Sequence, residues 1–429
     1  MKFYPLLGIC FLFAFNVFMG TSSAASSVSV VEISGKKIPE FLGFEIPKIT
    51  VRVFKAGQWN AIPFQIDEKT SDKVSSTRRW VLDTAFSRRT DLPRGNGKFD
   101  EDEVILFLSK DLGEKAPTFS GIATHGIEVN AGGSFAYLLF EAKQEMKTNQ
   151  SYMQYDSNAD SIDALGYKAH FTSAHAIVQD ELIPKNSRSA NPLNILDRFK
   201  VRMLLALKGL FEVKVEEDNI SSTKLGYRVG PIRLIRRITA YKALGPIRVT
   251  PKVQSDFVFY PYYVQVPTQL DNPLDGRKYL NENSKGYAGF DFTQAFYGTK
   301  FYFQRNSSPV ILDGKMSPEE KALITKDVTW WAATGDRGTV LVKMDWDTDL
   351  VKAGVTCDLY YMDDRSSLKP PEADPGEAVV GFQLNLNLVP PGNYMIYVTQ
   401  IFPPLPFSIG DEASILNNLV LKPQSFQSF

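Results

Sequence analysis

The sequence predicts an all-β fold of two β-sandwich domains, the second larger than the first, with one or two short helices. Apolar and polar residues alternate with period two in many short segments, such as 199–207. Turns that contain glycine, proline or asparagine separate these segments at short intervals, as in β-sandwiches. The chain has 429 residues, which is too long for one ordinary hydrophobic core, so we expect two domains.

Residues 1–25 have the layout of a cleaved secretory signal peptide. Lys2 precedes an uncharged run from Phe3 to Met19, and the small residues Ser23 and Ala25 stand where a signal peptidase would cut. We therefore expect export to the periplasm or the extracellular space. No later segment reaches the ~18 apolar residues of a membrane helix, so we expect no transmembrane segment after cleavage.

The charge balance and the cysteine count narrow the functional class. The chain has 48 basic and 48 acidic residues, and loss of Lys2 leaves 47 against 48, a net charge of −1. Such a balance provides no global field for nucleic acid, so we expect no nucleic-acid partner. The mature chain keeps one cysteine, Cys357, which we expect to be a buried structural thiol. An exported protein without disulfides is typical of a bacterial envelope.

The first predicted domain covers residues 26–145. Its strands are expected at 28–33, 49–54, 61–67, 104–108 and 134–140, with Pro63 favouring an edge or a bulge in the third. The run Val104–Leu108 is continuously apolar, which is typical of a strand that is buried on both faces.

A polar stretch, residues 146–162, is rich in Asn, Asp and Gln and is predicted to be a linker. The second domain then covers residues 163–429, with strands expected at 199–207, 210–215, 381–389 and 394–399. The segment Ser317-Pro318-Glu319-Glu320 has the pattern of a capping box and predicts a helix to about Lys326. Residues 411–421 are the second helix candidate.

A glycine turn followed by acids directly precedes the predicted strand 104–108 of the first domain. Set against a calcium-binding EF-hand loop, Asn96, Asp100 and Glu103 fall at positions five, nine and twelve, and Gly97 falls at the turn position six. Positions one and three lack the expected carboxylates, so half of the loop fits. We predict calcium as a cofactor, held by these three residues. The alternative is a β-turn whose acids face water. No haem, nucleotide or flavin signature occurs.

Two motifs of the first domain together carry a family resemblance. The segment Ile62–Glu68, IPFQIDE, and the segment Asn96–Glu103, NGKFDEDE, resemble those of a group of exported bacterial β-proteins. The resemblance covers about 50 residues and implies no activity and no catalytic residue. More loosely, the second domain is similar in pattern to large β-sandwich domains of carbohydrate-active proteins, which is an analogy of fold alone.

Three aspartates of the second domain alternate with other residues. Asp345, Asp347 and Asp349 would lie on one face of a strand, where their repulsion could be relieved by a metal ion or used as paired acids in hydrolysis. The alternative is a solvated strand end.

A basic segment followed by aromatics is the predicted ligand-binding surface. Residues 219–255 contain eight basic residues and no acid. The arginine fork suits carboxylate, sulfate or phosphate, and exposed tyrosines can stack on sugar rings. The residues predicted to bind are Arg233, Arg236, Arg237, Arg248, Tyr260 and Tyr262. The alternative is that the arginines pair with acids after folding and the aromatics pack in the core.

These patterns together predict an exported, non-catalytic binding or assembly protein of the bacterial envelope. Its expected partner is a glycan or an anionic envelope polymer. The rival is a glycan-active hydrolase or lyase that uses carboxylates of the second domain, either the three aspartates above or Asp363 and Asp364. A purely structural envelope protein is the third possibility.

Overall fold

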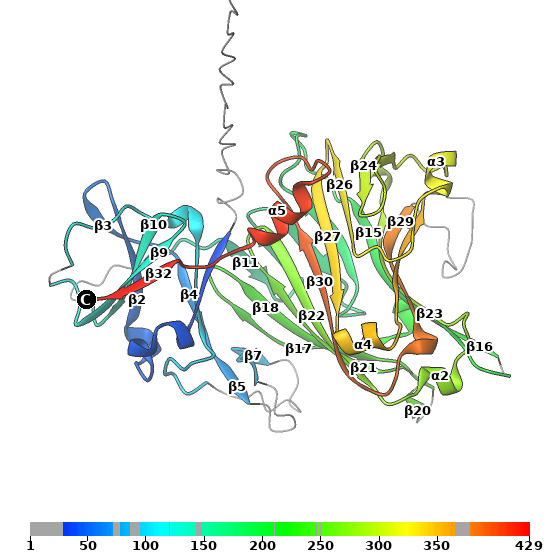
Figure 1. Ribbon diagram of the computed structural model, residues 1–429, viewed down its shortest axis with the longest axis horizontal. Helices are drawn as coiled ribbons and strands as arrows, with labels where there is room; N and C mark the ends of the chain where they lie inside the picture. Colours follow the sequence, from blue (N-terminus) through cyan, green and yellow to red (C-terminus); the bar gives the residue numbers. More distant parts are fainter. Residues whose placement is uncertain are drawn as a thin grey trace, which may run out of the picture.

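The computed structural model describes residues 29–71, 78–85, 95–119, 121–142, 148–209, 211–244, 247–248, 250–364 and 378–429. The predicted signal peptide, residues 1–25, lies outside these ranges. The described residues form seven sheets and four short α-helices, which confirms the all-β class. Figure 1 shows a smaller lobe, built from the N-terminal strands, beside a larger lobe.

The smaller lobe is a sandwich of two sheets. One has the strand order β31-β1-β8-β4 and the other β3-β2-β10-β9-β32. The first contains β1 (Val30–Ser34), β4 (Phe64–Asp67), β8 (Val104–Leu108) and β31 (Val420–Leu421). The second contains β2 (Ile49–Lys55), β3 (Gln58–Ala61), β9 (His125–Ala131), β10 (Ser134–Phe140) and β32 (Ser425–Ser428). Alternate residues of the strands, such as Val51, Ile105 and Phe107, fill the core between the sheets.

The C-terminal end of the chain returns to the smaller lobe. β31 pairs in parallel with β1, and β32 pairs antiparallel with β9, so that both cover strand edges. Figure 1 shows this segment in red, crossing from the larger lobe to the smaller one. The predicted second domain, residues 163–429, therefore wrongly includes β31 and β32, because these last strands belong to the first sandwich.

The predicted linker contains two strands. β11 (Met153–Asp156) and β12 (Ser161–Ala164) form a sheet with β13 (Tyr167–Phe171) and β14 (Gln179–Pro184). Met153 and Ile162 are buried, while Gln154 and Asp156 on the other face of β11 are exposed. One face of this hairpin is exposed and polar, and this polar composition led to the prediction of a linker.

The larger lobe is organised by a ten-stranded sheet of the order β25-β24-β26-β27-β30-β22-β21-β18-β17-β7. Its strands are β7 (Thr84–Ala85), β17 (Ser221–Val229), β18 (Leu234–Tyr241), β21 (Lys252–Phe259), β22 (Tyr263–Asn272), β24 (Lys300–Phe303), β25 (Val310–Ile311), β26 (Trp330–Gly335), β27 (Gly338–Trp346) and β30 (Gly392–Ile401). A five-stranded sheet of the order β16-β15-β23-β29-β28 packs against it. It contains β15 (Leu196–Ala206), β16 (Glu212–Val215), β23 (Lys285–Phe292), β28 (Cys357–Met362) and β29 (Ala378–Asn385).

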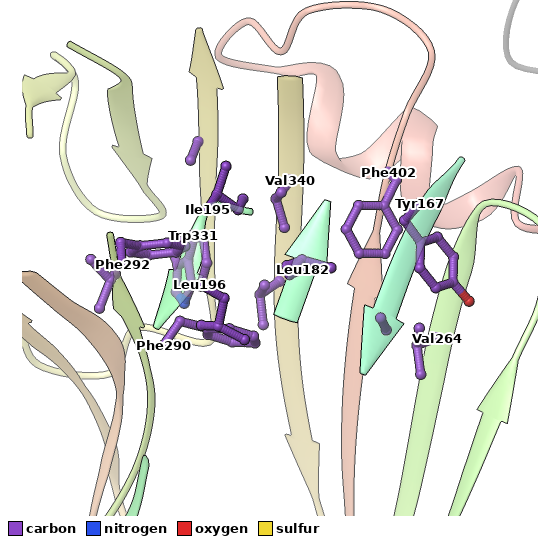
Figure 2. Packing of buried hydrophobic residues seen from close by; sticks show 14 of the residues in the cluster. Tyr167, Leu182, Ile195, Leu196, Val264, Phe290, Phe292, Trp331, Val340 and Phe402 are labelled. Atoms are coloured by element: carbon purple, nitrogen blue, oxygen red, sulfur yellow. The ribbon is translucent and has the colours of Figure 1, made fainter. Parts of the chain in front are cut away.

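The ten-stranded sheet buries both of its faces. Leu234 and Ile238 face a core that it shares with the sheets of β13 and β23, and Figure 2 shows Trp331 packed beside Phe290 and Phe292 in that core. Ile235 faces the other way, into a core shared with Leu106 of the smaller lobe. The sheet of β8 therefore lies between two cores, which explains why Val104–Leu108 is apolar at every position.

The helices are short and lie in connections. They are α2 (Gly276–Tyr279), α3 (Pro318–Lys321), α4 (Thr348–Lys352) and α5 (Asp411–Asn417). The capping box is present: Ser317 Oγ accepts from the Glu320 amide, and Glu320 accepts from the Ser317 amide. α3 ends five residues before the predicted Lys326. α2 and α4 are too short for periodicity to reveal them. No described helix has the length and apolarity needed to cross a membrane.

Two small sheets complete the described structure: β5 (Lys69–Ser71) with β6 (Arg78–Trp80), and β19 (Ala243–Leu244) with β20 (Ile247–Arg248). Cys357 is buried, and burial raises the pKa of its thiol well above the usual value.

Candidate functional site

The predicted calcium loop is held together by its own side chains. Asn96 Nδ2 donates to Asp100 Oδ2 at 2.8 Å, and the Asp100 amide donates to Glu103 Oε2 at 3.0 Å. Gly97 has a φ of +72°, and its amide donates to Glu68. Within the described residues, no group of three or more His, Cys, Asp or Glu side chains is arranged to hold a metal ion. Calcium binding therefore stays a prediction.

Glu103 is the unusual member of this loop because its side chain is buried. Burial raises the pKa of its carboxyl to about 7, and the nearby acids Glu68, Asp100 and Asp102 add to the rise. The hydrogen bond from the Asp100 amide opposes it. The carboxyl is therefore half protonated near neutral pH.

The three alternating aspartates do not share a strand face. β27 ends at Trp346, one residue before Asp347, which caps α4 by accepting from the Asp349 amide. Asp345 pairs with Lys343 at 2.7 Å, and Asp349 pairs with Lys352 at 2.9 Å. The prediction of a strand that aligns three carboxylates was wrong, because an Asp before a short helix was read as part of the strand.

The arginines of the predicted binding surface are largely internal. Arg233 is 1% exposed and Arg236 is fully buried, so neither side chain can meet a polymer. Arg233 donates to Asp67, which also accepts from Arg228. Asp67 lies on β4, so this cluster joins the two lobes. The guanidinium of Arg233 also lies 4.1 Å from the ring centre of Trp80.

Arg236 and its neighbour Arg237 each bind one carboxylate through the same two nitrogens. Arg236 donates from Nε and Nη2 to Asp160, and Arg237 donates from Nε and Nη2 to Asp256. Burial raises the pKa of Asp160, but Arg236, Tyr155 and Lys224 outweigh it, so that the pKa lies below its usual value. The structure thus favours the alternative in which these arginines pair with acids after folding.

Of the remaining predicted residues, one tyrosine is buried and the other is half-buried. Tyr260 is buried, and its hydroxyl accepts from Arg233 Nη1 at 2.9 Å. Tyr262 is half-buried. Arg248 lies on β20, opposite Ala243.

Of the two rival acids, Asp363 is held inside the fold. Asp363 is fully buried and accepts from the amides of Asp313 and Gly314, both at 2.7 Å. Burial raises the pKa of its carboxyl to about 6, and repulsion from Glu320 and Asp313 adds to the rise. This carboxyl closes a turn and does not face solvent.

An open depression lies at the end of the larger lobe, where α2 meets the turn between β15 and β16 and the short 3-10 helix η7 (Leu386–Leu388). Its volume is about 570 Å³. The lining residues are Lys208, Arg277, Leu280, Asn281, Glu282, Asn283, Asn387 and Leu388. Three amides, two cations and one acid therefore surround a small apolar floor.

The walls of the depression are fixed by hydrogen bonds between distant segments. Lys208 donates from its amide to the Tyr279 carbonyl and from Nζ to the Arg277 carbonyl. Arg277 Nη2 donates to the Ala353 carbonyl at 2.6 Å. Gly276 lies so close to η7 that an added Cβ would stand 2.4 Å from the Leu386 carbonyl oxygen. These contacts hold the side chains of Lys208 and Arg277 in place.

Two exposed aromatic residues adjoin the walls of the depression through backbone contacts. Phe211 is 63% exposed and Tyr279 is 45% exposed. Both flank Lys208, since the Leu207 amide donates to the Phe211 carbonyl and the Lys208 amide to the Tyr279 carbonyl. Sequence reasoning missed this site because its residues come from segments near 208, 280 and 387. Asn281-Glu282-Asn283 was the one local signal, a polar tripeptide that directly follows the apolar Leu280.

No protein-family model and no curated protein matches the chain. Among solved structures, an alpha-mannosidase from Enterococcus faecalis V583 is similar with a TM-score of 0.44 and 8% identity, over 94% of this chain and 44% of that one. A glycosyl hydrolase family 38 protein from Enterococcus faecalis gives a TM-score of 0.43 and 8% identity, over 94% and 45%. The Slr1438 protein from Synechocystis sp. PCC 6803 gives 0.32 and 9%, over 61% and 100%. The chain thus spans less than half the length of the first two structures, and at these TM-scores the similarities assign no function.

Proposed function

We propose that this protein is an exported, non-catalytic binder of an acidic envelope glycan, and that the depression around Lys208, Arg277 and Asn281 holds the sugar. The observation that supports the proposal is the composition of the depression: amide, cationic and apolar groups with exposed aromatics beside it. Binding sites for small molecules are commonly concave, with a few polar groups that fix orientation.

The lining groups match the chemistry of a sugar. Each asparagine amide offers donors and an acceptor, which suits the paired hydroxyls of a pyranose ring. The ring of Tyr279 offers an apolar face with a polar tip. Lys208 and Arg277 exceed the acidic Glu282 by one positive charge, which favours a glycan that carries carboxylate, sulfate or phosphate.

The arrangement of acids supports binding over hydrolysis. A glycosidase of the common type places two carboxyl groups about 5–9 Å apart across the scissile bond. Of the eight lining residues, Glu282 is the acidic one, while Asp345 and Asp349 pair with lysines and Asp363 is buried.

A titration of the mature protein, residues 26–429, with acidic and neutral polysaccharides tests the proposal. We expect an acidic polysaccharide to bind, to lose affinity as salt rises, and to be recovered at its original chain length. Newly formed reducing ends would favour the hydrolase instead, and unsaturated ends would favour the lyase. Equal binding of neutral and acidic polymers would remove the role assigned to Lys208 and Arg277.

A further inference from the structure

Arg52 of the smaller lobe is a buried charge that the glycan site does not use. It lies on β2 between Val51 and Val53, which face the core of the sandwich. Successive residues of a strand point to opposite faces, so Arg52 projects from the outer face of its sheet. Its side chain is nevertheless buried, with only 3% of the residue exposed.

The segment that follows β8 covers this outer face. The Glu114 amide donates to the carbonyl of Phe54, two residues after Arg52 on β2. The Ala116 amide donates at 2.7 Å to the hydroxyl of Tyr137, the residue opposite Arg52 on β10. Arg52 is therefore flanked on two sides by residues that hold this cover in place.

The guanidinium of Arg52 has no partner on one of its edges. Within the described part of the chain, neither Nε nor Nη2 has a hydrogen-bond acceptor, although both are buried. Thr50 Oγ1, two positions earlier on the same face of β2, is also buried and lacks a partner there. Burial lowers the pKa of Arg52, which shows that its charge is costly where it lies.

Other buried arginines of this chain show what that edge normally binds. Arg236 and Arg237 each place Nε and Nη2 on the two oxygens of one aspartate, and Arg202 does the same with Glu217. This side-on geometry is the common one for arginine and a carboxylate. Arg52 presents the same edge without a carboxylate.

The nearest acid in the strand register is already engaged. Glu128 lies opposite Tyr137 on β9, in the same row as Arg52. It accepts from the Tyr137 hydroxyl at 3.1 Å and pairs with Lys115 at 3.4 Å. Tyr137 therefore stands between Glu128 and Arg52, and Glu128 does not neutralise the guanidinium.

We propose that Arg52 and Thr50 form a binding site for one small oxyanion, a carboxylate or phosphate group, under the cover that contains Glu114 and Ala116. The anion accepts side-on from Nε and Nη2 of Arg52 and from Thr50 Oγ1. Because these atoms are out of reach of water in the closed form, part of the cover shifts as the anion enters. The site is independent of the depression in the larger lobe.

Thermal unfolding of the mature protein with inorganic phosphate or acetate tests this proposal, with chloride used to keep the ionic strength constant. We expect either anion to raise the Tm of the wild type, because a ligand that binds the native state stabilises it. In Arg52→Met this response disappears, and the variant melts above the wild type in chloride because an unpaired buried charge has been removed. Arg305→Met, at an exposed arginine, serves as the control that keeps the response.

A second variant keeps the proposal testable if Arg52→Met does not fold. Thr50→Val retains the guanidinium and removes the hydroxyl, and we expect phosphate to bind it several-fold more weakly by calorimetry. Equal responses of the wild type and Arg52→Met would overturn the proposal. So would the absence of phosphate and acetate binding by the folded wild type, or an unchanged phosphate affinity in Thr50→Val.

Discussion

At the scale of single residues, buried charges decide much of the behaviour of this protein. Asp67, Asp160 and Glu103 are all buried, yet their surroundings differ. Asp67 and Asp160 face arginines, whereas Glu103 faces other acids. A buried charge with a partner holds the fold, and one without a partner is costly.

Asp67 is the residue whose loss should cost most. It binds Arg228 and Arg233 across the contact between the lobes, and it accepts from Gln65 of its own strand. We expect Asp67→Asn to lower the free energy of unfolding by about 3–5 kcal/mol, because it leaves the buried Arg233 guanidinium without an anion. Urea denaturation measures this.

Asp83→Asn is the matched control, because Asp83 pairs with the same Arg228 but is 54% exposed. Its expected cost is below about 1 kcal/mol. Equal costs for the two variants would contradict the assignment of Asp67 as the centre of the cluster.

The raised pKa of Glu103 leads us to predict that the stability of the protein depends on pH in metal-free buffer. Its pKa is raised from 4.5 to about 7, so between these values the folded protein holds a proton that the unfolded chain releases. The free energy of unfolding should therefore fall as pH rises from 4.5 to 7, by about 3 kcal/mol from this group, and level off above.

Denaturation of the wild type and Glu103→Gln between pH 4.5 and 8 measures this effect. Glutamine keeps the acceptor for the Asp100 amide but does not titrate, so the fall attributed to Glu103 should be absent from the variant. Parallel pH profiles would show that the carboxyl does not carry the raised pKa.

At the scale of elements, several strands could be predicted from local pattern alone. Val104–Leu108 was expected as a buried strand and is one, and the capping box at Ser317 begins a helix. Contacts between residues that lie far apart in the sequence could not be predicted. Asp67 lies 166 residues from Arg233, and Val420 lies beside Val30, so neither contact leaves a local trace in the sequence. The depression was missed for the same reason.

The C-terminal strands are predicted to stabilise the smaller lobe. Leu419 is buried, and Leu421 and Phe426 pack on the sandwich core. A chain that ends at Asn418 should lose about 3 kcal/mol or more of stability, because the apolar burial of these groups is lost and the core surface that they cover is exposed to water. A chain that ends at Gln424 keeps β31 and should be intermediate. If both truncated chains melted like the full chain, the C-terminal return would carry no stability.

The acidic loop gives a separate prediction. If Asn96, Asp100 and Glu103 hold calcium, added calcium should raise the Tm of the wild type and chelator should lower it, since the ion binds the folded loop. Asp100→Ala should reduce the response. A melting curve unmoved by calcium and chelator would remove this prediction.

At the scale of the whole molecule, the two lobes share a core. Leu106 and Leu108 of the smaller lobe pack in one cluster with Ile235 and Tyr263 of the larger lobe, and β7 extends the ten-stranded sheet. We therefore expect one cooperative thermal transition, with equal calorimetric and van't Hoff enthalpies. Two resolved transitions would show that the lobes unfold separately.

The central claim is that the depression beside Tyr279 binds an acidic glycan. The most direct test compares Tyr279→Ala with Tyr397→Ala, because both tyrosines are 45% exposed. Tyr279 directly precedes the lining residue Leu280 and its carbonyl accepts from the Lys208 amide, whereas Tyr397 lies on β30. With an acidic polysaccharide that the wild type binds, we expect Tyr279→Ala to weaken the affinity roughly tenfold, as loss of about 1.4 kcal/mol of stacking implies, and Tyr397→Ala to leave it unchanged. Equal affinities of the two variants, or the absence of any acidic glycan that binds the wild type, would contradict the account.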